Sequence, residues 1–208
     1  MKVLSRYKDA FLIGILIIFH IIGLVLMISD PSNAELSYLN LALCAVIVLI
    51  AEGINLKSLG FFALVFAGGI FIEWIGVETG YLFGDYDYGA ALGAKIDGIP
   101  YVMGFNWYCI VLAGSAIFSK WKIHWILKAI LAGIACTALD VLIEPVAIHL
   151  DYWDWNTPEI PIFNYVCWWI FTALFAAIYF RFSKNRNKPA MALYGIWVVF
   201  FTVLNLTQ

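Results

Sequence analysis

The chain consists largely of long apolar stretches separated by short polar segments, which is the pattern of a protein that crosses a membrane several times. A helix needs about 20 consecutive apolar residues to span the hydrocarbon core of a bilayer. Seven stretches qualify, at residues 10–28, 36–54, 59–77, 101–118, 125–148, 160–182 and 190–206. Ser37, Asn40 and Glu52 interrupt the second stretch, which is the weakest of the seven. The pattern predicts an all-α, polytopic membrane protein with seven transmembrane helices in a single domain over residues 1–208.

The composition excludes a soluble protein with a charged surface. Hydrophobic residues make up 64% of the chain and charged residues only 12%, whereas soluble domains average about 25% charged residues. The outer surface is therefore expected to face lipid. The net charge of -2 argues against a nucleic-acid partner, because nucleic acid requires a basic face.

The distribution of basic residues predicts the orientation in the membrane. Eleven of the 12 Lys and Arg residues lie before the first stretch or in alternate loops, and only Lys95 lies on the opposite side. Cytoplasmic loops are enriched in Lys and Arg, so we expect a cytoplasmic amino terminus and an external carboxyl terminus. The longest polar segment, residues 78–100, would then be external, and its Gly, Asp and Tyr content is compatible with an ordered cap.

The middle of the chain contains an internal repeat. The first copy reads EWIGVETGYLFGDYDYG from Glu73 and continues with IPYVMGFNW from Ile99. The second copy reads EPVAIHLDYWDW from Glu144 and continues with IPIFNY from Ile160. Each copy has a glutamate near the end of an outward-running stretch, then an aromatic–Asp–aromatic triplet, then Ile-Pro and Phe-Asn-aromatic. Stretches three–four and five–six are therefore predicted to form two parallel helical hairpins related by a pseudo-two-fold axis along the membrane normal.

The repeat predicts that acidic side chains converge. If the two hairpins pack side by side, Glu73 and Glu144 lie at the same depth, and Asp140 lies one turn from Glu144 on the same helix face. Asn106 and Asn164 would enter the same layer from the returning helices. Ionisable residues inside a span are costly and usually face the bundle interior or a water-filled cavity. Because neighbouring buried carboxylates repel each other, we expect at least one of them to keep its proton.

At these motifs the sequence resembles the prokaryotic carotenoid 1,2-hydratases, the bisanhydrobacterioruberin or γ-carotene hydratase family of carotenoid biosynthesis proteins. The resemblance covers roughly residues 73–169, and the first, second and seventh stretches are similar only in being apolar. It implies that water is added across the terminal 1,2 double bond of an acyclic carotenoid, such as lycopene or a γ-carotene-like molecule taken from the bilayer. We expect a multi-pass protein of a prokaryotic plasma membrane, without a cofactor or metal ion and of open oligomeric state.

The acidic residues suit this chemistry. Hydration of a trisubstituted alkene needs a proton donor, tolerance of a tertiary cation, and a base that helps water to attack. Glu73, Asp140 and Glu144 are the candidate acid–base set, and Asn106 and Asn164 are expected to orient water or a carboxyl group. Aromatic faces stabilise cations. The aromatic candidates near the acids are Trp74, Trp107, Trp153, Trp155, Tyr165 and Trp168.

Other interpretations stay open. Glu73 is also compatible with a helix-end residue that reaches the external interface, and His20 is more typical of a hydrogen-bonded packing residue than of a ligand. The four cysteines are expected to be buried apolar side chains. A lycopene-cyclase-like enzyme would also protonate an alkene and would differ in what traps the cation. A small-solute transporter is the third possibility, since parallel repeats also occur in that class.

Overall fold

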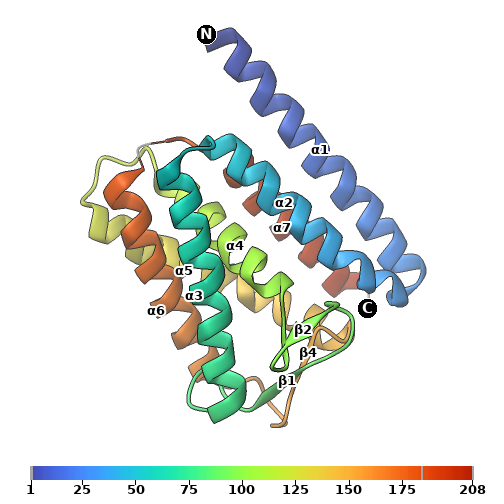
Figure 1. Ribbon diagram of the computed structural model, residues 1–208. Coiled ribbons are helices and arrows are strands. Elements are labelled where there is room, and N and C mark those ends of the chain that lie inside the picture. The colour runs from blue at the N-terminus through green and yellow to red at the C-terminus, as the bar shows by residue number, and fades with distance from the viewer. Residues whose placement is uncertain (1, 184, 208) are drawn as a thin grey trace.

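The described residues fold into a bundle of seven α-helices (Figure 1). The computed structural model describes residues 2–183 and 185–207, with side chains from residue 7 onward. The helices are α1 (Lys2–Ser29), α2 (Ser37–Glu52), α3 (Leu56–Thr79), α4 (Val102–Phe118), α5 (Trp125–His149), α6 (Ile162–Phe182) and α7 (Lys188–Thr207). Six are long and apolar enough to cross a membrane, and α4 is a shorter apolar helix. The predicted all-α, polytopic membrane architecture is confirmed.

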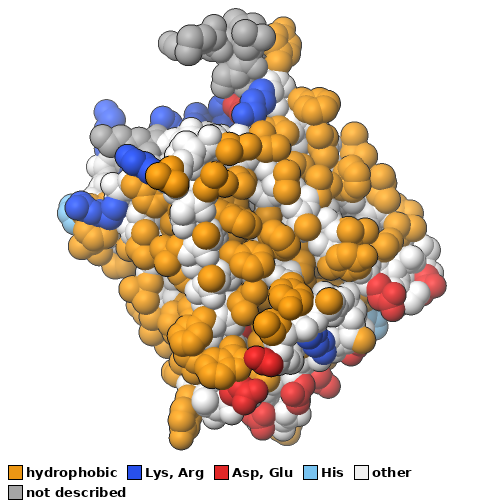
Figure 2. Space-filling view, in the orientation of Figure 1, with side chains coloured by type: hydrophobic (Ala, Val, Ile, Leu, Met, Phe, Trp, Pro, Cys, Tyr) orange, Lys and Arg blue, Asp and Glu red, His pale blue; other side chains and the backbone are white. Residues whose placement is uncertain are grey.

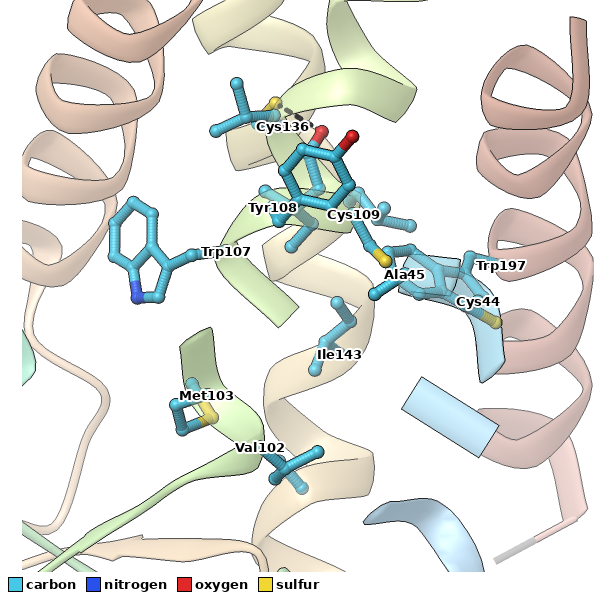
Figure 3. Packing of buried hydrophobic residues seen from close by; sticks show 14 of the residues in the cluster. Cys44, Ala45, Val102, Met103, Trp107, Tyr108, Cys109, Cys136, Ile143 and Trp197 are labelled. Atoms are coloured by element: carbon cyan, nitrogen blue, oxygen red, sulfur yellow. Dashed lines mark hydrogen bonds between the residues drawn. The ribbon is translucent and has the colours of Figure 1, made fainter. Parts of the chain in front are cut away.

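The short helix α4 forms the centre of the bundle. It packs against α2, α3, α5, α6 and α7, and every residue from Trp107 to Ala116 is buried. Figure 3 shows its buried side chains between those of α2, α5 and α7. Small residues allow membrane helices to approach closely, and Gly69 of α3 lies directly against the Trp107 side chain of α4. All four cysteines are free and buried in this interior, as predicted.

Charged side chains gather at the two ends of the bundle. Lys and Arg lie mainly at the end where α1 begins, Asp and Glu gather at the end that carries the strands, and an apolar belt separates them (Figure 2). The start of α1 and the end of α7 lie at opposite ends of the bundle (Figure 1), as an odd number of spans requires. The positive-inside rule assigns the basic end to the cytoplasm, and this orientation stays a prediction.

The acidic end is closed by an ordered cap, which we define as the α3–α4 and α5–α6 loops. Its central feature is an antiparallel pair of β1 (Tyr86–Tyr88) and β4 (Trp153–Trp155), in which Asp87 pairs with Asp154. A second pair joins β2 (Lys95–Ile96) to β3 (Ile99–Pro100). The two aromatic–Asp–aromatic triplets of the repeat are therefore strand partners around a local two-fold axis.

Strand geometry turns the aromatic rings of the triplets inward. Successive side chains of a strand point to opposite faces. The first and third residues of β1 and of β4 are accordingly buried, whereas the central residues, Asp87 and Asp154, are exposed. Asp87 accepts a hydrogen bond from the Asn156 amide at 3.0 Å, which ties the outer face of the cap together. Two tyrosines and two tryptophans of the cap thus point into the bundle, toward the acidic side chains described below.

The two hairpins are not equivalent in their surroundings. α4 is enclosed by five helices, whereas many side chains of α6, including Ile162 and Leu174, are exposed on the outer surface of the bundle. α4 also packs against α5, but the symmetry-related contact between α6 and α3 is slight. Residues at equivalent positions of the repeat on α4 and α6 therefore have different neighbours. This difference determines which of them belong to the site described below.

Candidate active site

Three acidic side chains lie buried beneath the cap. Glu73 of α3 is 3% exposed, and Asp140 and Glu144 of α5 are each 1% exposed. Such burial is costly for a carboxyl group unless hydrogen bonds or a retained proton compensate. The alternative that Glu73 reaches out to the external interface is wrong, because its side chain points into the protein.

Glu73 is held by one residue of the cap and one of α4. The Tyr86 hydroxyl donates to Oε2 at 2.5 Å, and the Trp107 indole Nε1 donates to Oε1 at 2.8 Å. Trp107 is fixed in turn by stacking on Trp168 of α6, with ring centroids 4.3 Å apart and an interplanar angle of 11°. Glu73 is thus oriented by rigid aromatic side chains.

Glu144 accepts hydrogen bonds from three N–H donors. The indoles of Trp153 and Trp155 each donate to Oε2 at 3.0 Å. The Asn164 amide donates to Oε1 at 2.8 Å. Hydrogen bonds to a charged acceptor are stronger than those between neutral groups, so this environment favours a carboxylate at Glu144.

Asp140 lies one turn below Glu144 and is linked to it through Asn164. The same Asn164 amide nitrogen that binds Glu144 is 3.3 Å from Asp140 Oδ2, at the long end of hydrogen-bond distances. Asp140 therefore has a single, shared donor among the described residues. It does not line the space between the other two acids.

Glu73 and Glu144 both line one small chamber. Its volume is about 20 Å³, and its wall also includes Met103, Asn164 and the rings of Phe83 and Trp168. A polar cavity of more than about 10–15 Å³ can hold one water molecule. Rings from the cap complete the wall, so the chamber presents two carboxyl groups surrounded by aromatic faces.

The tyrosines of the cap are held as neutral phenols. Burial raises the pKa of Tyr86 well above its ordinary value. Burial likewise raises the pKa of Tyr88. Tyr86 is therefore available at neutral pH as a hydroxyl group that can both donate and accept a hydrogen bond.

The structure brings together most, but not all, of the residues singled out from the sequence. Trp107 and Asn164 bind the acids, and Trp168 lines the chamber. Tyr165 is half-buried and does not line it. Trp74 is 40% exposed on the outer surface, where it stacks on Phe71.

Asn106 does not line the acid chamber, contrary to the prediction that it enters the site with Asn164. It faces a separate cavity between α1, α2, α4 and α7. The repeat aligned it with Asn164, but the central position of α4 turns it toward a different neighbour. In its place, the next residue of α4, Trp107, supplies a donor to the acids.

Sequence reasoning missed the part that the cap plays as a hydrogen-bond donor. Trp153 and Trp155 were expected only as aromatic surfaces, and Tyr86 only as part of a repeat. The signal was present, because residues one and three of a strand share a face. Two indoles separated by one aspartate could therefore bind one acceptor, as they do at Glu144.

The fold and the chamber define a multi-pass membrane protein with buried carboxyl groups in an aromatic setting. A family described as carotenoid biosynthesis protein matches residues 34–208, and the chain belongs to this family. The match extends well beyond the 73–169 region of resemblance and includes α2 and α7, which were expected to be similar only in being apolar. No curated protein and no solved structure matches the chain.

Proposed function

We propose that this protein is a carotenoid 1,2-hydratase, a hydro-lyase that adds water across the terminal double bond of an acyclic carotenoid end. The observation that carries the proposal is the placement of Glu73 and Glu144 on the wall of one chamber large enough for a water molecule. Membership of the carotenoid biosynthesis family supports the substrate class. A prokaryotic plasma membrane is the proposed location.

The hydrogen-bond partners suggest which acid gives the proton. All three donors to Glu144 are N–H groups, which cannot accept a proton from it. The partner of Glu73 Oε2 is the hydroxyl of Tyr86, which can reverse its role and accept. A protonated carboxyl group is therefore accommodated at Glu73, and a carboxylate at Glu144.

The reaction then has a simple balance. Glu73 transfers its proton to the less substituted carbon of the terminal alkene, and the double-bond electrons form the new C–H bond. The tertiary cation left behind is stabilised by the chamber rings, at about 0.5–2 kcal/mol per well-placed ring. Water attacks the cation and loses a proton to Glu144, which gives a tertiary alcohol. Return of that proton to Glu73 completes the cycle, so the net reaction consumes one water.

Asp140 acts in this scheme as a positioning residue. It shares the Asn164 amide with Glu144, so it fixes the orientation of that amide from below. It does not line the chamber and therefore does not touch the reacting atoms. We expect Asp140→Asn to reduce conversion less than loss of either chamber acid.

The test is pigment analysis in a lycopene- or γ-carotene-producing host. The chain should yield a product heavier by one water, and Glu73→Gln and Glu144→Gln should each lower conversion by about 10²–10⁴-fold. The matched control is Glu78→Gln, because Glu78 lies on the same helix as Glu73 but is exposed.

Three results would overturn the proposal. An isomeric product of unchanged mass would indicate a cyclase, in which the carotenoid itself traps the cation. Unchanged pigment together with solute uptake into vesicles would indicate a transporter. Near-normal conversion by both chamber variants would show that these acids do not carry the reaction.

A further inference from the structure

A second and much larger cavity lies beside the acid chamber. It has a volume of about 450 Å³ and is lined mainly by α1, α2, α4 and α7 together with the short helix η1 (Pro31–Leu36). This size falls within the range of about 300–1,000 Å³ that is typical of small-molecule sites. Its wall is mostly apolar, with side chains such as Leu26, Leu43, Ile143 and Phe200, and it also carries the polar side chains of His20, Asn40 and Asn106.

The large cavity and the acid chamber share a wall. Met103 of α4 and Trp153 of β4 line both spaces. Trp153 is fixed by its hydrogen bond to Glu144, whereas a methionine side chain is unbranched and adapts its shape readily. Of the two shared side chains, Met103 is therefore the one that can change its shape more readily.

The large cavity also opens toward lipid. Phe19 and Ile22 of α1 and Leu36 and Leu39 near the start of α2 line it, and each is about half exposed, between 46% and 54%. In a membrane-spanning helix, exposed apolar side chains face the hydrocarbon core. The mouth thus lies between α1 and α2, which run side by side in Figure 1.

The chamber by itself is too small for the reaction that we propose. Its volume of about 20 Å³ suits one water molecule but not a water together with a branched alkene end. The reacting end must therefore come from a neighbouring space. Of the two cavities described, the large one is mostly apolar, is open to the bilayer and shares Met103 and Trp153 with the wall of the acid chamber.

We infer that this cavity is the binding site for the terminal isoprenoid segment of the substrate, which enters from the bilayer between α1 and α2. Movement of Met103 then admits the terminal double bond to the acid chamber, while the rest of the long chain stays in lipid outside the mouth. The inference rests on the proposed function for the identity of the substrate. Occupation of the cavity can be measured without the reaction.

The first test fills the cavity. Gly23 of α1 lines it, and a Cβ atom there would meet only Phe200, at 3.9 Å, so Gly23→Phe places a ring in the cavity without a backbone clash. Gly14→Phe is the matched control, because a Cβ at Gly14 on the same helix meets nothing within 4 Å. Gly23→Phe should lower conversion about tenfold or more, and Gly14→Phe by less than about twofold. Equal conversion by the two variants would overturn the inference.

The second test measures binding directly. A geranylgeranyl hydrocarbon with a terminal diazirine is photolysed with the purified protein in phosphatidylcholine vesicles, and the labelled residues are mapped by mass spectrometry. We expect labels on Ile22, Leu26 and Leu43 that excess lycopene removes and that Gly23→Phe abolishes. Labels confined to outward-facing residues such as Phe71 would overturn the inference.

A diazirine-bearing phosphatidylcholine identifies the other possible occupant. If it labels the same residues and lycopene does not displace it, the cavity holds a lipid acyl chain, and the inference is wrong. Lycopene-sensitive labelling without any hydrated product would instead reject the proposed reaction and retain the binding site. Met103→Trp should keep the label but lower conversion, and normal conversion by this variant would remove the role of Met103.

Discussion

Substitution of Gly69 by alanine should disturb the candidate active site through the packing of α3 against α4. Gly69 lies on α3 against Trp107, and a Cβ atom there would lie 2.5, 2.6 and 2.7 Å from the Cγ, Cδ1 and Cβ atoms of that side chain. Non-bonded carbon atoms are comfortable at about 3.5–4.0 Å. Because the Trp107 Cβ is attached to the α4 backbone, rotation of the indole alone cannot relieve the clash. α3 and α4 must separate instead.

The required shift is large enough to break a hydrogen bond. Relief of the closest contact needs roughly 1 Å, and the Trp107–Glu73 hydrogen bond, now 2.8 Å long, would lengthen to a distance at which no bond remains. Overpacking of a well-packed interior typically costs about 1–3 kcal/mol. Inside a helix, alanine is more favourable than glycine by about 1 kcal/mol of folding free energy. The control must therefore be another Gly→Ala substitution in the same helix, so that this contribution cancels.

Gly60→Ala supplies the comparison. Gly60 lies on the same helix, and a Cβ atom there meets nothing within 4 Å. Gly69→Ala should melt below Gly60→Ala by roughly 2–12 °C in the same detergent and at the same scan rate, and should convert less carotenoid at equal expression. If the two variants melt together and convert equally, the close contact between Gly69 and Trp107 is not important for the site.

Two other substitutions test the hydrogen bonds around buried carboxyl groups. Tyr86→Phe removes the hydroxyl donor to Glu73 but keeps the ring, and should lower conversion by about 10²-fold; Tyr81→Phe, at an 80% exposed position, is the control. Equal pigment from both would exclude a role for that hydroxyl. Glu52→Ala should lower the free energy of unfolding by about 1–3 kcal/mol, as measured by thermal melting, while exposed Glu35→Ala should change it little. Glu52→Ala removes the acceptor of the Tyr179 and Ser183 hydroxyls and one of the acceptors of the Asn185 and Asn187 amides. A melting temperature equal to that of Glu35→Ala would contradict this.

The polar interruption of the second apolar stretch has a structural explanation. Glu52 was noted from the sequence only as a weakness of that stretch. In the fold it is the common acceptor that ties the end of α2 to the end of α6 and to the connection into α7, with the Ser183 hydroxyl at 2.6 Å. The partners are separated from Glu52 by more than 120 residues of sequence, so no local pattern could identify them.

His20 was interpreted correctly as a hydrogen-bonded residue, but its neighbours were not predictable. Its Nδ1 lies 2.7 Å from the Leu16 carbonyl oxygen, and its Nε2 accepts from the Trp197 indole at 2.9 Å. The first partner is local and follows from helix periodicity. The second comes from α7, and it places the histidine on the wall of the large cavity.

The sequence by itself determined the number of helices and the burial of three acids. These features depend on the length of apolar runs and on the cost of an isolated charge in lipid, and both are local properties of the chain. The duplicated motif also indicated correctly that Glu73 and Glu144 meet. Only the tertiary structure decided which asparagine binds Glu144 and Asp140, because Asn106 and Asn164 occupy equivalent places in the repeat but α4 is central and α6 is not. Tertiary packing likewise formed the apolar cavity from four helices, since such a space exists only where side chains from distant segments fail to fill the gap between them.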